Sequence, residues 1–306
     1  MIPVRAAEPG PSIGPAQREL MRELIDLKRV RSAGRDGSVA TRLFRAGWAM
    51  LVAGAQPDDV AARVTAAGIA AARLGDLDHA KLLDLGLTAS AAVEVLRRGF
   101  DELAGAIAEP WRATLRAALA HPPQDGPVPR FVRLLEAQPR AGVTCPGKPR
   151  LMLEPAESHA DHCFAVAVGG AALAPCYGAE PAAVFMAGMA HHLHSAPMPD
   201  SGFSGEVLLG DALDGMIERA RARSLAELAP ALAARVRAAL APIAGSATPE
   251  ACAFHAADVL DRVLEIESHL NASRATTETV LHDHELVHAG PVKAFHDRVL
   301  AEAGIA

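Results

Sequence analysis

The 306-residue sequence has few cysteines, few aromatic residues and no long apolar run. Its cysteines are widely spaced and form no C-x-x-C pair. This spacing argues against a disulfide framework or a zinc knuckle and favours free thiols in a reducing cytosol. The aromatic fraction is only 4%, which argues against an all-β fold because strands prefer aromatic and β-branched residues. No apolar run reaches the roughly 18 residues that a membrane-spanning helix needs.

The sequence also lacks an excess of basic charge and an export signal. The net charge is −6 and no basic block is present, which argues against a dedicated nucleic-acid binder. An acidic surface also does little to attract anionic lipid. The stretch from Met1 to Pro15 has no apolar h-region and does not resemble a signal peptide. We therefore expect a cytoplasmic protein with neither a nucleic-acid polymer nor a membrane as partner; the oligomeric state, a homodimer included, stays open.

Helix-forming patterns fill most of the chain. Half of the residues are apolar, enough for a full core. Leu20, Leu24 and Leu27 follow the spacing of one helical face, with Met21 and Ile25 beside it. Other helices are expected where proline or a capping residue opens a helical pattern, at 38–52, from 57, from about 90, at 181–191 and at 249–270. The sequence therefore predicts an all-α fold.

A breaker-rich stretch divides the chain. Prolines, Asp125 and Gly126 crowd the segment from His121 to Pro129, and such residues mark loops. We predict an N-terminal helical domain at 1–120, with a packing or interaction role, then a linker and extended segment at 121–156. A metal-binding helical domain is predicted at 157–306.

Histidines are concentrated after residue 150, where eleven of the thirteen lie. Six of them form three groups, two of which include acidic residues: His159 and His162 with Asp161, then His191, His192 and His194, then His255 with Asp258 and Asp261. Imidazole and carboxylate are natural ligands for a divalent Fe, Mn, Co, Ni or Zn ion. Burying neutral imidazoles without partners is unfavourable, and a metal supplies a partner. The groups therefore predict a metal centre.

Three short motifs around these histidines resemble the HD-domain metal-dependent phosphohydrolases. His162 is followed four and five residues on by Val166 and Ala167, as in the first helix of that family. The run that ends in His191-His192 resembles the second helix, and Ala257-Asp258-Val259-Leu260 resembles the closing Ala-Asp-x-Leu. The resemblance implies an HD-like helical bundle in which the metal ligands are His162, His191, His192 and Asp258. The intervals of 29 and 66 residues suit the family.

A further stretch, Glu206-Val-Leu-Leu-Gly-Asp211, resembles the Glu-Val-Leu-Thr-Gly-Asp stretch of HD-type 5′-deoxynucleotidases. That resemblance implies that Glu206 acts on the attacking water and that Asp211 lies at the substrate site. In those enzymes an arginine before the first histidine binds the substrate phosphate, which makes Arg150, with Lys148 beside it, the candidate here. The four motifs lie in the family's order, with about a dozen residues inserted after His192.

The chain departs from the family at His192, which stands where the namesake aspartate is expected. With a divalent ion, two His and two Asp make a neutral site, whereas three His and one Asp leave a net charge of +1. The extra charge favours an anionic ligand and lowers the pKa of bound water further. Histidines with one carboxylate also resemble non-haem iron sites. The replacement therefore weakens the hydrolase interpretation and strengthens that of an oxygenase.

Several other histidines have an open role. Successive helical residues point about 100° apart, so His191 and His192 can share an ion only near a helix end. His159 and His194 are candidates for a supporting position or a second metal. The cluster of His282, His284 and His288 with Asp283 is interpreted as an exposed C-terminal helix.

The sequence thus predicts metal-dependent hydrolysis of a small phosphorylated substrate, a nucleotide among the options. Glu206 would take a proton from water, and Arg150 or Lys148 would neutralise the phosphate. One alternative is an HD-type iron oxygenase, although Ser195 to Phe254 lacks the two histidines that a di-iron set needs. Another is a non-catalytic metal-bound sensing or interaction module.

Overall fold

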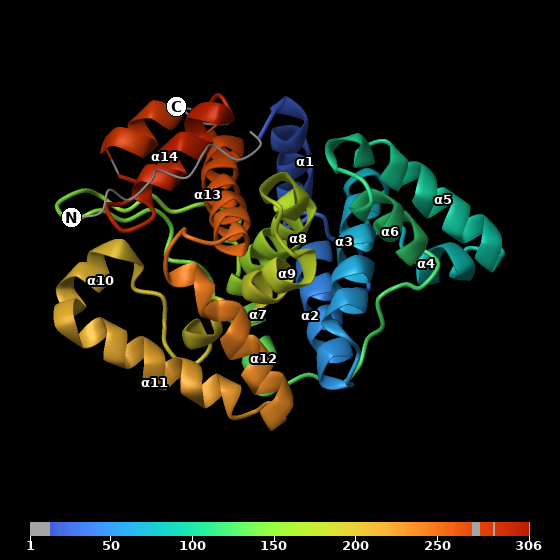
Figure 1. Cartoon of the computed structure of the whole chain (residues 1–306), viewed down its shortest axis with the longest axis horizontal. Helices are drawn as coiled ribbons and strands as arrows, with labels where there is room; N and C mark the ends of the chain where they lie inside the picture. The colour runs from blue at the N-terminus through green and yellow to red at the C-terminus, as the bar shows by residue number, and fades with distance from the viewer. Residues whose placement is uncertain (1–12, 271–275, 284, 306) are drawn as a thin grey trace.

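The computed structural model describes residues 13–270, 276–283 and 285–305 (Figure 1). The prediction of an all-α fold is confirmed in this part of the chain, where extended backbone pairs only at two isolated bridges between α7 and α8. Predictions for residues 1–12 and His284 lie outside it. The α-helices are α1 (Pro15–Asp26), α2 (Val39–Val52), α3 (Pro57–Leu74), α4 (His79–Asp84), α5 (Ala89–Asp101), α6 (Trp111–Ala118), α7 (Arg130–Ala137), α8 (His159–Tyr177), α9 (Pro181–Ala190), α10 (Gly202–Leu209), α11 (Leu213–Leu225), α12 (Pro230–Leu240), α13 (Pro249–Leu270) and α14 (Lys293–Glu302).

Short turns of other helix types join some of these elements. They are η1 (Ala104–Ala106), η2 (Leu193–Ser195), η3 (Gly210–Ala212), η4 (Pro242–Ala244) and η5 (Thr279–Asp283). The helix starts predicted from proline and capping residues are confirmed. Ser38 caps α2 by accepting a hydrogen bond from the Thr41 amide, and Pro57, Pro181 and Pro249 each occupy the first position of a helix.

Helix α8 is the central element, and it brings the site together. Its residues are buried without interruption from His159 to Ala174, and it packs against α9, α13 and α2 (Figure 1). The approach to α9 is close, because a Cβ at Gly188 would collide with the backbone of Ala167. Only glycine permits this contact. The close crossing sets the C-terminal end of α9 beside the first turns of α8.

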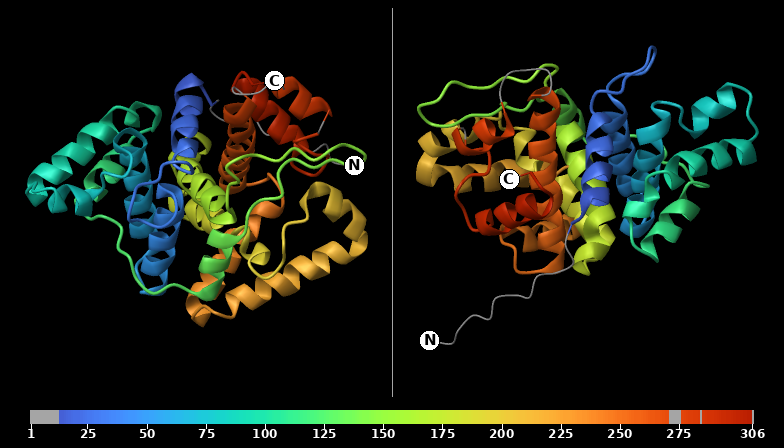
Figure 2. Two further views of the ribbon diagram at one scale, coloured as in Figure 1. Left: turned by 180° about the vertical axis from the view of Figure 1, so that it is seen from behind. Right: turned by 90° about the horizontal axis from the view of Figure 1, so that it is seen from above.

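The helices on either side of the breaker-rich stretch share one hydrophobic core. Phe44 and Trp48 of α2 belong to the same buried cluster as Phe164 of α8 and Phe185 of α9. Figure 2 shows α1–α3 lying directly against the central helices, with α4–α6 farther out. Helices on both sides of residues 121–156 therefore contribute to this core.

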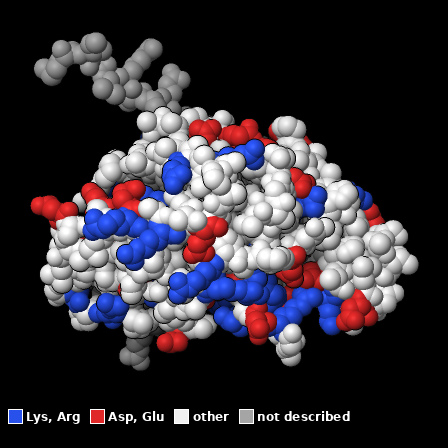
Figure 3. Space-filling view, turned by 90° about the horizontal axis from the view of Figure 1, so that it is seen from below, with Lys and Arg blue, Asp and Glu red and all other residues white. Residues whose placement is uncertain are grey.

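The surface carries charges of both signs. In the view from below, Lys and Arg gather in a band with Asp and Glu set between them (Figure 3). Many such charges pair locally, as Arg63 does with Asp59 and Arg133 with Glu136. Among the described residues, no helix has both the length and the apolar character needed to cross a membrane.

Candidate metal centre

The start of α8 is fixed by a capping box that also anchors α2. The Ser158 hydroxyl accepts the Asp161 amide at 3.1 Å, and the Asp161 carboxylate accepts the Ser158 amide in return, also at 3.1 Å. The same carboxylate accepts hydrogen bonds from the Ser38 and Thr41 hydroxyls at the start of α2. Asp161 is therefore a structural residue. It fixes the first turn of α8, from which His162 projects toward α9 and α13.

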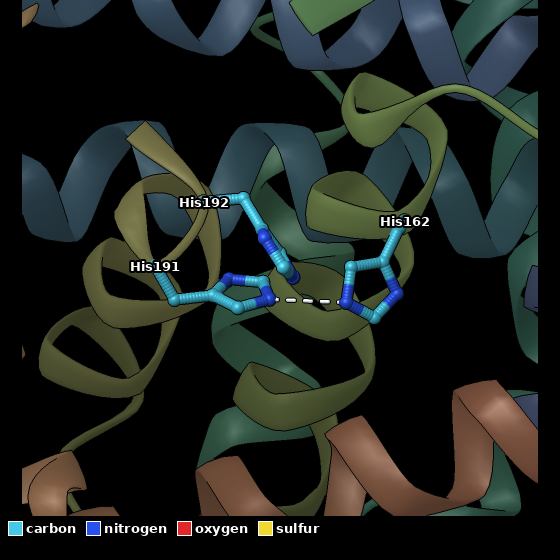
Figure 4. Close-up of side chains that lie close together, drawn as sticks. All are labelled: His162, His191 and His192. Carbon is cyan, nitrogen blue, oxygen red and sulfur yellow. Dashed lines mark hydrogen bonds between the residues drawn. The ribbon is translucent and has the colours of Figure 1, made fainter. Parts of the chain in front are cut away.

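Three of the predicted ligands, His162, His191 and His192, face one another from α8 and the end of α9 (Figure 4). The predicted helix end is confirmed. His191 is the last residue with helical torsion angles, and His192 has φ −100° and ψ 20°. This break turns the second imidazole from its helical direction and lets adjacent histidines point to one place. Each ring offers a nitrogen within 4.8 Å of the others.

Hydrogen bonds determine which nitrogens of His162 and His191 carry protons. The His162 Nδ1 lies 2.6 Å from a carboxylate oxygen of Asp261, and the His191 Nδ1 lies 2.8 Å from the Gly188 carbonyl oxygen. Both partners are acceptors, so both Nδ1 atoms donate. In the neutral rings the Nε2 atoms then carry lone pairs, and these two atoms lie 3.1 Å apart. Two lone pairs this close need a cation between them, either a proton or a metal ion.

The spacing of the ligand atoms suits a metal ion. The His162 Nε2 lies 3.1 Å from the His191 Nε2 and 3.3 Å from a carboxylate oxygen of Asp258. When metal–ligand bonds are about 2.1 Å long, neighbouring ligand atoms in tetrahedral or octahedral sites lie about 3.0–3.4 Å apart. The His191 Nε2 and the Asp258 oxygen therefore each lie at a distance from the His162 Nε2 that suits neighbouring ligands of one divalent ion.

Ionisation states in the centre also suit metal binding. Burial, together with the neighbouring His162 ring, holds the pKa of His191 well below its ordinary value. Burial opposes ionisation of Asp258, but its contact with the His162 ring and the charge of Arg262 together hold its pKa well below the usual range. At neutral pH the site presents a neutral imidazole and a carboxylate, the forms that bind metal.

Both ring nitrogens of His192 contact residues outside the group of three histidines. Burial and the neighbouring His191 lower its pKa, so it is neutral. Its Nε2 lies 3.4 Å from the Arg140 guanidinium and its Nδ1 lies 3.3 Å from the Ser195 hydroxyl. To ligate a metal through Nε2, His192 would have to exchange the Arg140 contact for the ion.

The residues predicted to contact substrate lie at the surface. Lys148 and Arg150 are exposed, and the Arg150 guanidinium donates to the Ala141 carbonyl. Glu206 on α10 and Asp211 in η3 are also exposed. None of the four makes a hydrogen bond or ion pair with the three histidines in the part of the chain that the structure describes. Arg140 is the guanidinium that does reach them, and its side chain is only 20% exposed.

His159 and His194 flank the histidine cluster. His159 is 1% exposed, and its ring centroid lies 4.8 Å from that of His192. The Asp200 carboxylate lies 3.5 Å from its Nε2 and accepts two backbone N–H groups. The rings of His192 and His194 lie 5.3 Å apart. Both flanking residues therefore pack against His192, beside the pair of facing Nε2 atoms.

The remaining histidine groups lie apart from the centre. His255 uses its Nε2 to contact the carbonyl oxygens of Ile243 and Gly245, at 3.0 Å each. His288 stacks on Phe203 with ring centroids 3.7 Å apart. His282 is exposed and lies in the short π-helix η5, within the C-terminal helical segment that the sequence predicts.

A second group of ligand-type atoms lies on the other side of the His162 ring. It comprises Glu157, His162 and Asp261. The Lys28 ammonium contacts two of these residues, at 2.6 Å from Glu157 and 2.7 Å from Asp261. A metal ion at this position would meet a fixed positive charge. Lys28 therefore takes the place of a cation there.

The sequence motifs do not identify several polar residues around the centre. Arg140 and Asp200 come from separate loops and Lys28 from the turn that follows α1, and Asp261 is visible in the sequence only as a neighbour of Asp258 on one helix. A signal exists for Asp261, because it follows Asp258 by three residues and so shares its helical face. Arg140 and Asp200 lie in irregular segments, whose positions depend on long-range packing.

Acidification is expected to destabilise the metal-free protein. Burial and the charge of Arg140 lower the pKa of His159 to about 3, so below about pH 6.5 the unfolded chain binds a proton there that the folded chain does not. The free energy of unfolding then falls by up to about 1.4 kcal/mol per pH unit for this group. Urea titrations with a chelator at about pH 7, 6 and 5 measure the slope. His159→Gln should reduce it by about one proton, and an unchanged slope contradicts the assignment.

Comparison of the chain with protein-family models, with curated proteins and with solved structures gives no match. Within the described residues, the structure itself shows an all-α fold with a buried group of histidines that could hold a metal ion.

Proposed function

We propose that this protein is a metal-dependent hydrolase of a small phosphomonoester, with nucleotides as the first substrates to test. The proposal includes the relationship to HD-domain phosphohydrolases that the sequence motifs suggest. One observation supports it most directly: the Nε2 atoms of His162 and His191 lie 3.1 Å apart, and each ring is oriented by an acceptor at its Nδ1. A preformed pair of this kind is typical of a metal centre.

A divalent ion held by His162, His191, His192 and Asp258 would polarise a phosphoryl oxygen and lower the pKa of a bound water. Arg140 is the residue that would bind the substrate phosphate. Burial opposes the charge of Arg140, but Glu157 and Asp200 raise its pKa, so the guanidinium stays charged. A planar guanidinium offers two parallel donors to a phosphate. We therefore assign phosphate binding to Arg140 in place of Arg150 or Lys148.

We assign the role of proton acceptor to Glu206. It lies on α10, which follows the histidine cluster in the chain, and Asp211 follows in η3. Partial desolvation and the charge of Asp200 raise the pKa of Glu206, which makes its carboxylate a better proton acceptor. Asp211 would bind the rest of the substrate.

An iron oxygenase is the second candidate, and the ligand set is the observation that favours it. Three histidines and one carboxylate provide the ligand chemistry of a non-haem iron site. Protein purified without chelator should carry about one divalent metal per chain by elemental analysis. A panel of phosphomonoesters, assayed beside oxygen uptake, separates the two activities. Metal-loaded protein that turns over no phosphomonoester in a broad panel contradicts the hydrolase proposal.

His192→Asp tests the two functions at the position where the chain leaves the family. In a hydrolase the change restores a neutral site, so metal should stay bound and phosphatase activity should change by about tenfold or less. In an iron oxygenase the same change should lower iron affinity and oxygen uptake together, with no phosphatase activity in either form. If metal content and both activities are all unchanged, His192 is not a ligand.

A further inference from the structure

Lys28 is a buried cation just beyond the end of α1. Its side chain is 1% exposed, and its Nζ contacts three carboxylates: Glu157 at 2.6 Å, Asp261 at 2.7 Å and Glu265 at 3.4 Å. Burial opposes its charge, but these carboxylates hold its pKa above the ordinary value. The lysine thus brings a full positive charge from the N-terminal part of the chain into the space between α8 and α13.

Asp261 connects Lys28 to the metal centre. One of its carboxylate oxygens contacts the Lys28 Nζ, and the other accepts the His162 Nδ1 proton at 2.6 Å. The opposite nitrogen of the same ring, Nε2, faces His191 and Asp258. An unbroken line of short contacts therefore runs from Lys28 through Asp261 and the His162 ring to the candidate metal position.

Asp261 depends on Lys28 more than the other two carboxylates do. Glu157 also pairs with Arg140 at 3.3 Å, and Glu265 also pairs with Arg29 at 2.6 Å. For Asp261, which is 0% exposed, Lys28 is the one lysine or arginine partner within the described residues. An ionised carboxylate with neither water nor a cation beside it is unfavourable in a protein interior.

We propose that Lys28 is a positioning residue of the metal centre, which acts through Asp261 to fix the His162 ring with its Nε2 toward the ion. This inference rests on the metal centre of the proposed function. The ammonium holds one oxygen of Asp261 at 2.7 Å, which leaves the other oxygen in place to accept the His162 Nδ1 proton at 2.6 Å. Such a partner fixes the proton on Nδ1 and makes the ligating nitrogen more basic. The turn that follows α1 thereby becomes part of the site.

A purely structural role for Lys28 makes a different prediction. Other ion pairs also join α1 to α13, among them Arg18 and Arg22 with Glu267. If Lys28 only held these helices together, its loss would resemble the loss of one of them. Arg22 is the control, because it joins α1 to α13 at 2.9 Å without touching Asp261.

Zinc affinity, measured by competition with a chromophoric chelator, is the first test. Lys28→Met keeps most of the side-chain length and removes the charge. It should bind zinc about 10–100-fold more weakly than the parent, the usual effect of losing a partner behind a ligand. Arg22→Met should stay within about threefold of the parent even though it loses an ion pair between the helices. Equal affinities in Lys28→Met and the parent overturn the inference.

A double-variant comparison tests the route through Asp261. Asp261→Asn should weaken zinc binding by a similar factor, and adding Lys28→Met to it should change the affinity by less than about threefold, because the connection is already broken. The double variant removes one charge of each sign, so it avoids a buried unpaired carboxylate if Lys28→Met alone fails to fold. A further loss of tenfold or more shows that Lys28 does not act through Asp261.

The outcomes separate this inference from the proposed function. A parent protein that binds no zinc or other divalent metal overturns both. A parent that binds zinc but hydrolyses no phosphomonoester contradicts the hydrolase alone, and the zinc affinities of the variants still decide the role of Lys28.

Discussion

Replacing His162 with alanine is expected to remove most metal binding from this protein. The His162 Nε2 is close to two other ligand atoms: it lies 3.1 Å from the His191 Nε2 and 3.3 Å from an Asp258 carboxylate oxygen. If four ligands share the roughly 10–16 kcal/mol of a structural zinc site, losing one costs about 3 kcal/mol, or about 10²-fold in affinity. Elemental analysis and chelator competition measure the loss.

The same variant should also be less stable when metal is supplied. Metal binds the folded state, so the parent gains stability in proportion to its occupancy. His255→Gln is the matched control. His255 is a histidine of α13 that contacts the backbone carbonyls of Ile243 and Gly245, and its replacement should leave metal content unchanged. Full metal occupancy in His162→Ala rules out the ligand assignment.

Much of the fold is predictable from the sequence, because residues at the helix starts themselves determine where the helices begin. Ser38 caps α2 with its own side chain, and prolines at 57, 181 and 249 occupy first helical positions where a missing N–H does no harm. The sequence also predicts an extended segment within 121–156, and its backbone pairs at an isolated bridge between Val143 and Leu151. Such signals act over a few residues and need no tertiary contact.

The histidine cluster was predictable for a different reason. His162 and the pair His191-His192 lie in strongly apolar helices, and polar residues inside such helices need a buried partner. The end of α9 lets both adjacent imidazoles face one centre. Sequence spacing therefore identified which histidines meet, although it could not show that the Nε2 of His192 faces Arg140.

Residues that reach the site from distant segments were not predictable in the same way. Arg140 follows a proline in an irregular segment, and its position depends on the pairing of Pro139 with Ser158. For Lys28, however, the sequence pattern does indicate a buried position. It continues the helical spacing of Met21 and Ile25, both buried, so a lysine stands where that face calls for an apolar residue. A charge on a core face predicts a buried partner, but it cannot show which carboxylates provide it.

The largest effect on turnover is expected from Glu206→Gln, which keeps the size of the side chain and removes its basicity. General-base catalysis contributes about 10²–10⁴ in rate, so kcat for any phosphomonoester that the parent hydrolyses should fall by that factor. None of the residues of α10 is buried, so the change should leave metal content and the free energy of unfolding as they are. This makes loss of activity attributable to the carboxylate itself.

Glu218→Gln is the matched control for this experiment. Glu218 is an exposed glutamate of α11 that pairs with Arg221 of the same helix, and surface pairs of this kind contribute little to stability. The control should keep the parent's kcat and metal content. If Glu206→Gln turns over substrate at the parent rate, the proton acceptor lies elsewhere. Asp200 would then be the next carboxylate to replace, since it stands 3.5 Å from His159 beside the histidine cluster.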